Sequence, residues 1–131
     1  MNQLHDKSVL IVDDDPGVLQ AMKRVLAREG MQVTGLSDPL AGLKALAYSP
    51  RRFDLLITDL RMPALSGRGV LGFASAARPE LPVILVTAFG GAEIEAQALN
   101  LGAFAFMEKP VAARQLVETA KRALSQAQTE S

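Results

Sequence analysis

The fold is decided by the stretch Phe53-Asp54-Leu55-Leu56-Ile57-Thr58-Asp59-Leu60-Arg61-Met62-Pro63. A short and largely apolar run leads directly into Asp59, and Pro63 then turns the chain. A continuous apolar run between turn signals is typical of a strand that is buried on both faces of a parallel sheet. We therefore place Asp59 at the carboxyl end of a buried strand, which is the edge where functional residues of open α/β sheets gather.

The same unit, a strand followed by a helix, recurs along the whole chain. An apolar run from Ser8 ends at consecutive aspartates, and Asp15 followed by Pro16 predicts a helix cap and the first helical residue. The sequence predicts strands at about 8–12, 31–36, 53–58, 81–86 and 103–107, and helices at about 16–30, 39–49, 68–78, 92–101 and 111–126. The third helix is predicted to face the core with Val70, Phe73, Ala74 and Ala77.

Five such units with short connections require parallel strands and right-handed crossovers. We predict an α/β fold, a single doubly wound (βα)5 domain whose five-stranded sheet has the flavodoxin-like order 2-1-3-4-5. The domain is expected to span residues 1–131, with a core at about 8–126 and no effector domain in this chain.

Composition narrows the class of protein. The 131 residues carry 14 basic and 14 acidic side chains, so the overall charge does not favour binding to nucleic acid or to an anionic membrane. The chain has no cysteine, which excludes a disulfide scaffold and a thiolate metal site. No stretch reaches the ~20 apolar residues of a membrane span, and residues 1–7 lack the apolar core of a signal peptide, so we expect a cytoplasmic protein.

Side chains that can bind ligands or take part in reactions follow four of the five predicted strands. Asp13 and Asp14 end the first strand, and Asp59 ends the third. Thr87 ends the fourth strand, and Lys109 ends the fifth. Taken singly, each has an ordinary structural explanation, such as a turn, a strand end or a solvated charge. Because the carboxyl ends of parallel strands share one edge, we expect carboxylates, a hydroxyl and an ammonium to converge there.

Such a group of carboxylates favours a bound cation. Neighbouring carboxylates repel one another and raise each other's pKa unless a positive charge lies among them. Mg²⁺ prefers oxygen ligands and keeps several waters, so one or two carboxylates, a backbone carbonyl and a phosphoryl group would make a suitable set. A lysine and a threonine at the same edge would add a positive charge and a hydrogen-bond donor for an incoming phosphoryl group.

Four separated motifs closely resemble the receiver domains of two-component response regulators. They are Val12-Asp13-Asp14-Asp15, Ile57-Thr58-Asp59-Leu60-Arg61-Met62-Pro63, Val83-Ile84-Leu85-Val86-Thr87-Ala88 and Phe106-Met107-Glu108-Lys109-Pro110. The resemblance covers residues 9 to about 124, and the motifs occur in the order of the family, each at the end of a predicted strand.

The resemblance implies a phosphoacceptor and a magnesium site. Asp59 would accept a phosphoryl group from a histidine kinase and become an aspartyl phosphate. Asp14 would be a direct Mg²⁺ ligand, and Asp13 would act mainly through water. Asp59 and the backbone carbonyl of Arg61 would complete the protein's share of the ligands.

The resemblance also implies a switch. Lys109 would pair with the phosphoryl oxygens, and its bond to Pro110 would be cis. The Thr87 hydroxyl and the Ala88 amide would close on the phosphoryl group, and Phe106 would rotate into the space that Thr87 leaves. Without this role, Phe106 would be an ordinary core or half-buried aromatic residue. The surface that changes would comprise the fourth helix, the last strand and the last helix.

The expected partner is a sensor histidine kinase or a phosphotransfer protein. A phosphorylation-dependent homodimer and an effector domain missing from this chain are further possibilities, whereas this domain would bind neither nucleic acid nor a membrane directly. Catalysis would be limited to the domain's own phosphorylation and dephosphorylation, so we do not class it as an enzyme.

Two other functions are compatible with parts of the pattern. One is a receiver-like docking module that no longer accepts phosphate. The other is a Mg²⁺-dependent phosphatase of the haloacid-dehalogenase type, whose nucleophile belongs to an Asp-x-Asp pair after the first strand. Asp13 and Asp15 superficially form such a pair, but no cap domain or later acidic pair follows, and Asp59 with Met62-Pro63 would have no explanation.

Overall fold

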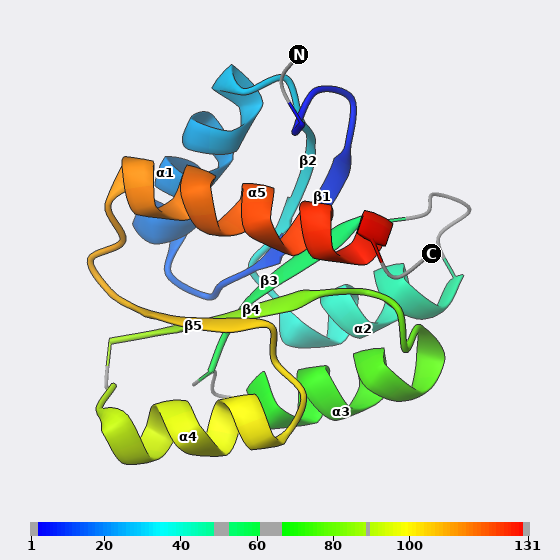
Figure 1. Cartoon of the computed structure of the whole chain (residues 1–131), viewed down its shortest axis with the longest axis vertical. Coiled ribbons are helices and arrows are strands. Elements are labelled where there is room, and N and C mark those ends of the chain that lie inside the picture. The colour runs from blue at the N-terminus through cyan, green and yellow to red at the C-terminus, as the bar shows by residue number, and fades with distance from the viewer. Residues whose placement is uncertain (1–2, 49–52, 61–66, 89, 130–131) are drawn as a thin grey trace.

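The computed structural model describes residues 3–48, 53–60, 67–88 and 90–129. Strands and helices alternate throughout these residues (Figure 1). The elements are β1 (Ser8–Val12), α1 (Pro16–Arg28), β2 (Gln32–Leu36), α2 (Pro39–Tyr48), β3 (Leu55–Asp59), α3 (Gly67–Ala77), β4 (Val83–Thr87), α4 (Ala92–Asn100), β5 (Ala105–Glu108) and α5 (Ala113–Thr129). Each predicted strand and helix is present, with boundaries shifted by a few residues.

The sheet has the predicted topology. Its strands are all parallel and lie in the order β2-β1-β3-β4-β5, so β3, with Asp59 as its last residue, occupies the centre. Figure 1 shows α1 and α5 on one face and α2, α3 and α4 on the other. Because the helices cover both faces, the central strands β3 and β4 are buried along their whole length.

Two hydrophobic layers hold the helices to the sheet. Alternate residues of each strand point to opposite faces, so Val9 and Ile11 pack towards α1 and α5, whereas Leu10 and Val12 pack towards α2 and α3. Leu, Ile and Val dominate both layers, as expected for strands that are covered on both sides. Packing on both faces of the sheet holds the carboxyl ends of the central strands in position.

The start of α1 follows the predicted capping pattern. Asp15 is the N-cap, and its Oδ1 accepts hydrogen bonds from the amides of Gly17 at 2.9 Å and Val18 at 3.2 Å. Pro16 occupies the first helical position, where a missing amide proton costs nothing. Asp15 is therefore a structural residue that ends the acidic run after β1.

The buried face of α3 differs from the predicted one. Val70, Leu71 and Ala74 are buried, whereas Phe73 is 38% exposed and Ala77 is also exposed. The buried face is centred on Val70, Leu71 and Ala74, so it is rotated about the helix axis relative to the predicted one and leaves Phe73 and Ala77 towards solvent.

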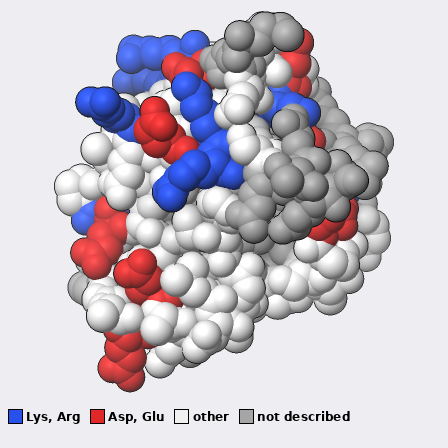
Figure 2. All heavy atoms as spheres, viewed as in Figure 1, with Lys and Arg blue, Asp and Glu red and all other residues white. Residues whose placement is uncertain are grey.

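Charged side chains are mixed on the face that α1 and α5 cover. Figure 2 shows lysines and arginines gathered in the upper part of this view with acidic side chains among them, and acidic side chains lower down over α4. Among the described residues, no helix is both long enough and apolar enough to cross a membrane.

Candidate functional site

The carboxyl ends of four strands meet at one edge of the sheet, as predicted. Asp13 follows β1 directly, and the register pairs Val12 at the end of β1 with Thr58 beside Asp59. Thr87, the last residue of β4, pairs with Glu108, the last residue of β5. Parallel pairing alone therefore brings residues from four separate motifs to one place.

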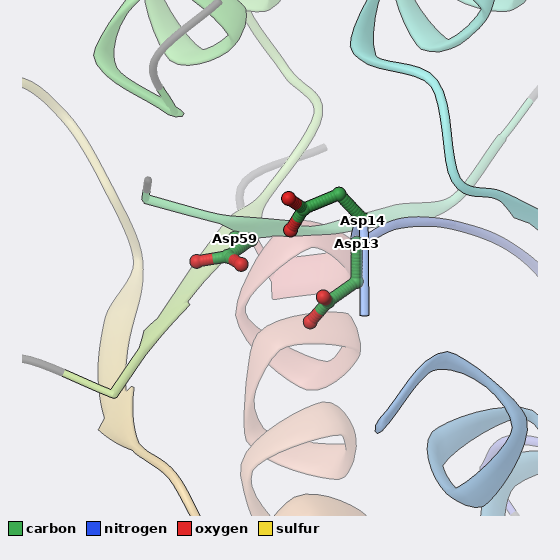
Figure 3. A group of neighbouring side chains, drawn as sticks. All are labelled: Asp13, Asp14 and Asp59. Atoms are coloured by element: carbon green, nitrogen blue, oxygen red, sulfur yellow. The ribbon is translucent and has the colours of Figure 1, made fainter. Parts of the chain in front are cut away.

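Three aspartates form a compact acidic cluster. One carboxylate oxygen from each of Asp13, Asp14 and Asp59 lies within 4.8 Å of the other two, and Figure 3 shows the three side chains together. Asp13 is fully buried and Asp59 is 5% exposed, whereas Asp14 is exposed. Two carboxylates are thus held out of water, and the third borders solvent.

Backbone hydrogen bonds hold Asp13 in place. Its amide donates to the carbonyl of Leu36 at 3.1 Å, which continues the β1–β2 pairing beyond the last strand residue. Its Oδ1 accepts a hydrogen bond from the amide of Asp15 at 2.9 Å. Asp13 therefore combines the turn-forming role of an aspartate after a strand with membership of the acidic cluster.

Lys109 bridges the two buried carboxylates. Its Nζ lies 3.0 Å from Asp13 Oδ2, 3.3 Å from Asp13 Oδ1 and 3.0 Å from Asp59 Oδ2. The backbone amide of Lys109 donates to the carbonyl of Thr87 at 2.8 Å, and the Lys109–Pro110 bond is cis, as expected. The contact with Asp13 was not predicted from the sequence, where Lys109 was assigned to phosphoryl oxygens alone.

The pKa values of Asp13 and Lys109 reflect this arrangement. Burial raises the pKa of Asp13, and the negative charge of Asp59 adds to this effect, while hydrogen bonds from Asp15 and Lys109 oppose it. Burial lowers the pKa of Lys109, but the hydrogen bonds to Asp13 and Asp59 together with the negative charges of these two carboxylates outweigh burial and raise the pKa above its ordinary value. The ammonium form of Lys109 is therefore favoured in the folded state.

The acidic cluster suits a divalent metal ion. Three carboxylates and one ammonium leave two formal negative charges uncompensated among these four side chains. All available donor atoms are oxygens, which hard divalent cations prefer. Burial raises the pKa of the Asp13 carboxyl, and a cation bound among the three carboxylates would stabilise its charged form.

The remaining predicted residues lie on β4 and β5 or directly after them, with one exception. Thr87 is fully buried at the end of β4, and Ala88 is exposed next to it. Phe106 is half-buried and packs against the hydrophobic layer beneath α2, α3 and α4. The predicted carbonyl ligand, Arg61, lies outside the described residues.

Comparison with known proteins identifies the class. The family described as "Response regulator receiver domain" matches residues 9–121, and the chain belongs to this family. Response regulator protein PilR of Pseudomonas aeruginosa is 35% identical over 119 residues, which cover 88% of this chain and 26% of PilR. The protein is therefore a receiver domain of the two-component response regulators, a signalling domain that phosphorylation activates. The chain spans about a quarter of the length of the curated relatives it matches.

Solved structures agree with this assignment. A CheY-like receiver domain protein from Methanospirillum hungatei has a TM-score of 0.89 and 33% identity, covering 96% of this chain and 99% of that one. The beryllofluoride-activated NtrC4 receiver domain dimer has a TM-score of 0.85 and 25% identity, covering 92% of this chain and 98% of that one.

Neutralising Asp13 is expected to stabilise the metal-free protein. Asp13→Asn keeps an acceptor for the Asp15 amide but removes one of the clustered charges, so the free energy of unfolding should rise by about 0.5–2 kcal/mol near neutral pH. Because the folded-state pKa of Asp13 is raised above 3.8, the gain should shrink as the pH falls through that pKa and wild-type Asp13 takes up a proton. Urea unfolding in the presence of a chelator measures the difference.

Asp38→Asn is the matched control, since Asp38 is exposed and its Oδ1 accepts from the Leu40 amide at the start of α2, a role that asparagine also fills. A gain for Asp13→Asn that is no larger than the control value, or that persists unchanged into acid, would contradict the account.

Proposed function

We propose that Asp59 is the phosphoacceptor of this receiver domain and that Mg²⁺ is the metal it requires. One observation carries the proposal, namely that the Asp59 carboxylate lies beside Lys109 and within 4.8 Å of the Asp13 and Asp14 carboxylates. The central strand β3 holds this carboxylate in position. The ammonium of Lys109 and the other two carboxylates of the acidic cluster lie beside it.

The chemistry follows from these neighbours. An oxygen of Asp59 attacks the phosphorus of a phosphohistidine, and the P–N bond breaks with its electron pair going to the imidazole. Lys109 stabilises the charge on the transferred phosphoryl oxygens. Asp13 and Asp14, with the carbonyl of Arg61, would hold the Mg²⁺ ion, which supplies positive charge to the phosphoryl group when bound.

A conformational switch is the second part of the proposal. An aspartyl phosphate adds negative charge and strong acceptor oxygens at Asp59, which favours an arrangement in which Thr87 and Ala88 donate hydrogen bonds to it. Thr87 is buried at the end of the neighbouring strand, and Phe106 is half-buried one strand further along. We infer that movement of Thr87 makes room for Phe106 and alters the surface of α4, β5 and α5.

The partners follow from the class and from the relatives. We propose a histidine kinase or a phosphotransfer protein as the phosphoryl donor. Because the curated relatives are about four times as long as this chain and PilR is a response regulator protein, we propose that this receiver controls an effector domain in a longer protein. The NtrC4 receiver structure is a dimer, which supports phosphorylation-dependent pairing of two receivers as the signal. We also propose that the protein acts in the cytoplasm.

Trapping of the acyl phosphate tests the assignment of Asp59. After incubation with phosphoramidate and Mg²⁺, borohydride reduction should convert one aspartate into homoserine. Trypsin cleaves after Arg52 and Arg61, so Asp54 and Asp59 fall in one peptide and its fragment ions decide between them. We expect the modification at Asp59 alone, and its persistence in Asp59→Asn or its loss in Asp54→Asn would contradict the assignment.

A receiver-like docking module remains the competing function. It would show no homoserine under any of these conditions, including transfer from a phosphorylated histidine kinase. A haloacid-dehalogenase-type phosphatase would instead place the modification at Asp13.

A further inference from the structure

Glu108 lies against the backbone of the connection between β4 and α4. This connection follows Thr87, and its described residues are Ala88, Gly90 and Gly91. A Cβ atom on Gly90 would collide with the Cγ, Cδ and Oε1 atoms of Glu108. The side chain of Glu108 therefore occupies the place that a side chain at position 90 would take.

The conformation of Gly90 does not itself demand glycine. Its φ lies outside the left-handed region, in contrast to the φ of +133° at Gly91. The local backbone is therefore compatible with an alanine at position 90, and the three nearest atoms that its Cβ would meet all belong to the exposed, flexible side chain of Glu108. The close approach of Glu108 is thus the structural reason for a glycine at this position.

Glu108 is fixed relative to the strand that carries Thr87. It is the last residue of β5 and pairs with Thr87 in the β4–β5 register, and the next amide, that of Lys109, donates to the Thr87 carbonyl at 2.8 Å. Glu108 is two residues after Phe106, so both side chains point to the face that α4 covers. In Figure 1 the end of β5 and the start of the β4–α4 connection lie at the same edge of the sheet.

We infer that Glu108 restrains the β4–α4 connection and so disfavours its closure over Asp59. Displacement of Ala88 towards a phosphoryl group moves Gly90 with it, whereas Glu108 stays with β5. On this inference the contact between Glu108 and Gly90 is made in the open state and lost on closure, so it stabilises the open state relative to the closed one. This inference rests on the proposed closure of Thr87 and Ala88 on phosphorylated Asp59.

Beryllofluoride with Mg²⁺ is the probe of closure, because it activates the related NtrC4 receiver. Amide NMR signals of Ala88 and Gly90, followed during titration, report the closed fraction and give an apparent affinity. Removal of the restraint by Glu108→Ala should raise this affinity about three- to tenfold, since a ligand that selects the closed state binds more tightly when that state is more populated. Glu108→Gln keeps the shape of the side chain and should behave as the wild type.

Gly90→Ala supplies an independent route to the same result. The added methyl group displaces Glu108 without altering its charge, so the affinity should rise as it does for Glu108→Ala. Because Glu108→Ala and Gly90→Ala remove the same contact, the variant that carries both substitutions should show no further gain in affinity. Glu93→Ala is the charge-matched control, as Glu93 is an exposed carboxylate in the first turn of α4.

The outcomes separate the inference from the function on which it rests. If wild-type protein shows no beryllofluoride binding that requires Asp59, the proposed function fails. If the wild type binds but Glu108→Ala matches Glu93→Ala, or if the Glu108 and Gly90 effects are additive, the restraint is contradicted. Two-dimensional amide spectra of each variant verify folding, and the Gly90→Ala result decides the question if Glu108→Ala is misfolded.

Discussion

Replacement of Lys109 by methionine is expected to strengthen Mg²⁺ binding by at least about tenfold while slowing phosphoryl acceptance by about a hundredfold or more. In the wild type, Nζ of Lys109 lies 3.0 Å from both Asp13 Oδ2 and Asp59 Oδ2 and repels a second cation. Two unit charges ~4 Å apart interact by about 4 kcal/mol at an effective dielectric constant of ~20, so loss of the ammonium should be easily measured. Phosphoryl acceptance should slow because the positive charge that stabilises the transferred group is gone.

Calorimetric titration with Mg²⁺ and the rate of phosphorylation by acetyl phosphate give the two quantities. Lys44→Met is the matched control, since Lys44 is exposed on α2 and its loss changes the net charge equally. Unchanged or weakened Mg²⁺ binding in Lys109→Met would mean that Lys109 does not compete with the metal. Equal phosphorylation rates in Lys109→Met and Lys44→Met would mean that Lys109 takes no part in the reaction.

Truncation of Ile57 is expected to cause the largest loss of stability. Ile57 is fully buried in the middle of β3 and pairs with Ile11 and Ile84 on the neighbouring strands. Ile57→Ala removes three buried carbon atoms from a layer that α1 and α5 cover, and should lower the free energy of unfolding by about 2–5 kcal/mol. Urea unfolding followed by circular dichroism measures this loss.

Leu40→Ala provides the comparison on the surface. Leu40 is 51% exposed on α2, so its truncation should cost less than about 0.5 kcal/mol. If the two substitutions reduced stability equally, β3 would not be the packed centre that holds Asp59 in position.

The fold was predicted correctly, and its topology determines where the residues at the strand ends lie. Parallel strands end at one edge, so Asp13, Asp59, Thr87 and Lys109 converge whatever their separation along the chain. Apolar runs with clear turn signals also defined the strands, since a strand covered on both faces needs a continuous apolar sequence.

Other features depend on three-dimensional contacts that no local pattern encodes. The pairing of Lys109 with Asp13 joins residues 96 positions apart and depends on where a long flexible side chain settles. Apart from the glycine itself, no sequence pattern indicates that Glu108 lies close to Gly90. The predicted inward position of Phe73 on α3 was wrong because the buried face is centred on Val70, Leu71 and Ala74, and the sequence alone does not specify which part of an apolar stripe meets the sheet.

Intact-mass measurement after incubation with acetyl phosphate tests the central claim most directly. The wild type with Mg²⁺ should gain about 80 Da, the mass of one phosphoryl group. The gain should vanish in Asp59→Asn and in wild-type protein from which a chelator has removed the metal. A gain that survives in Asp59→Asn would place the phosphoryl group elsewhere, and a gain without Mg²⁺ would contradict the role assigned to the acidic cluster.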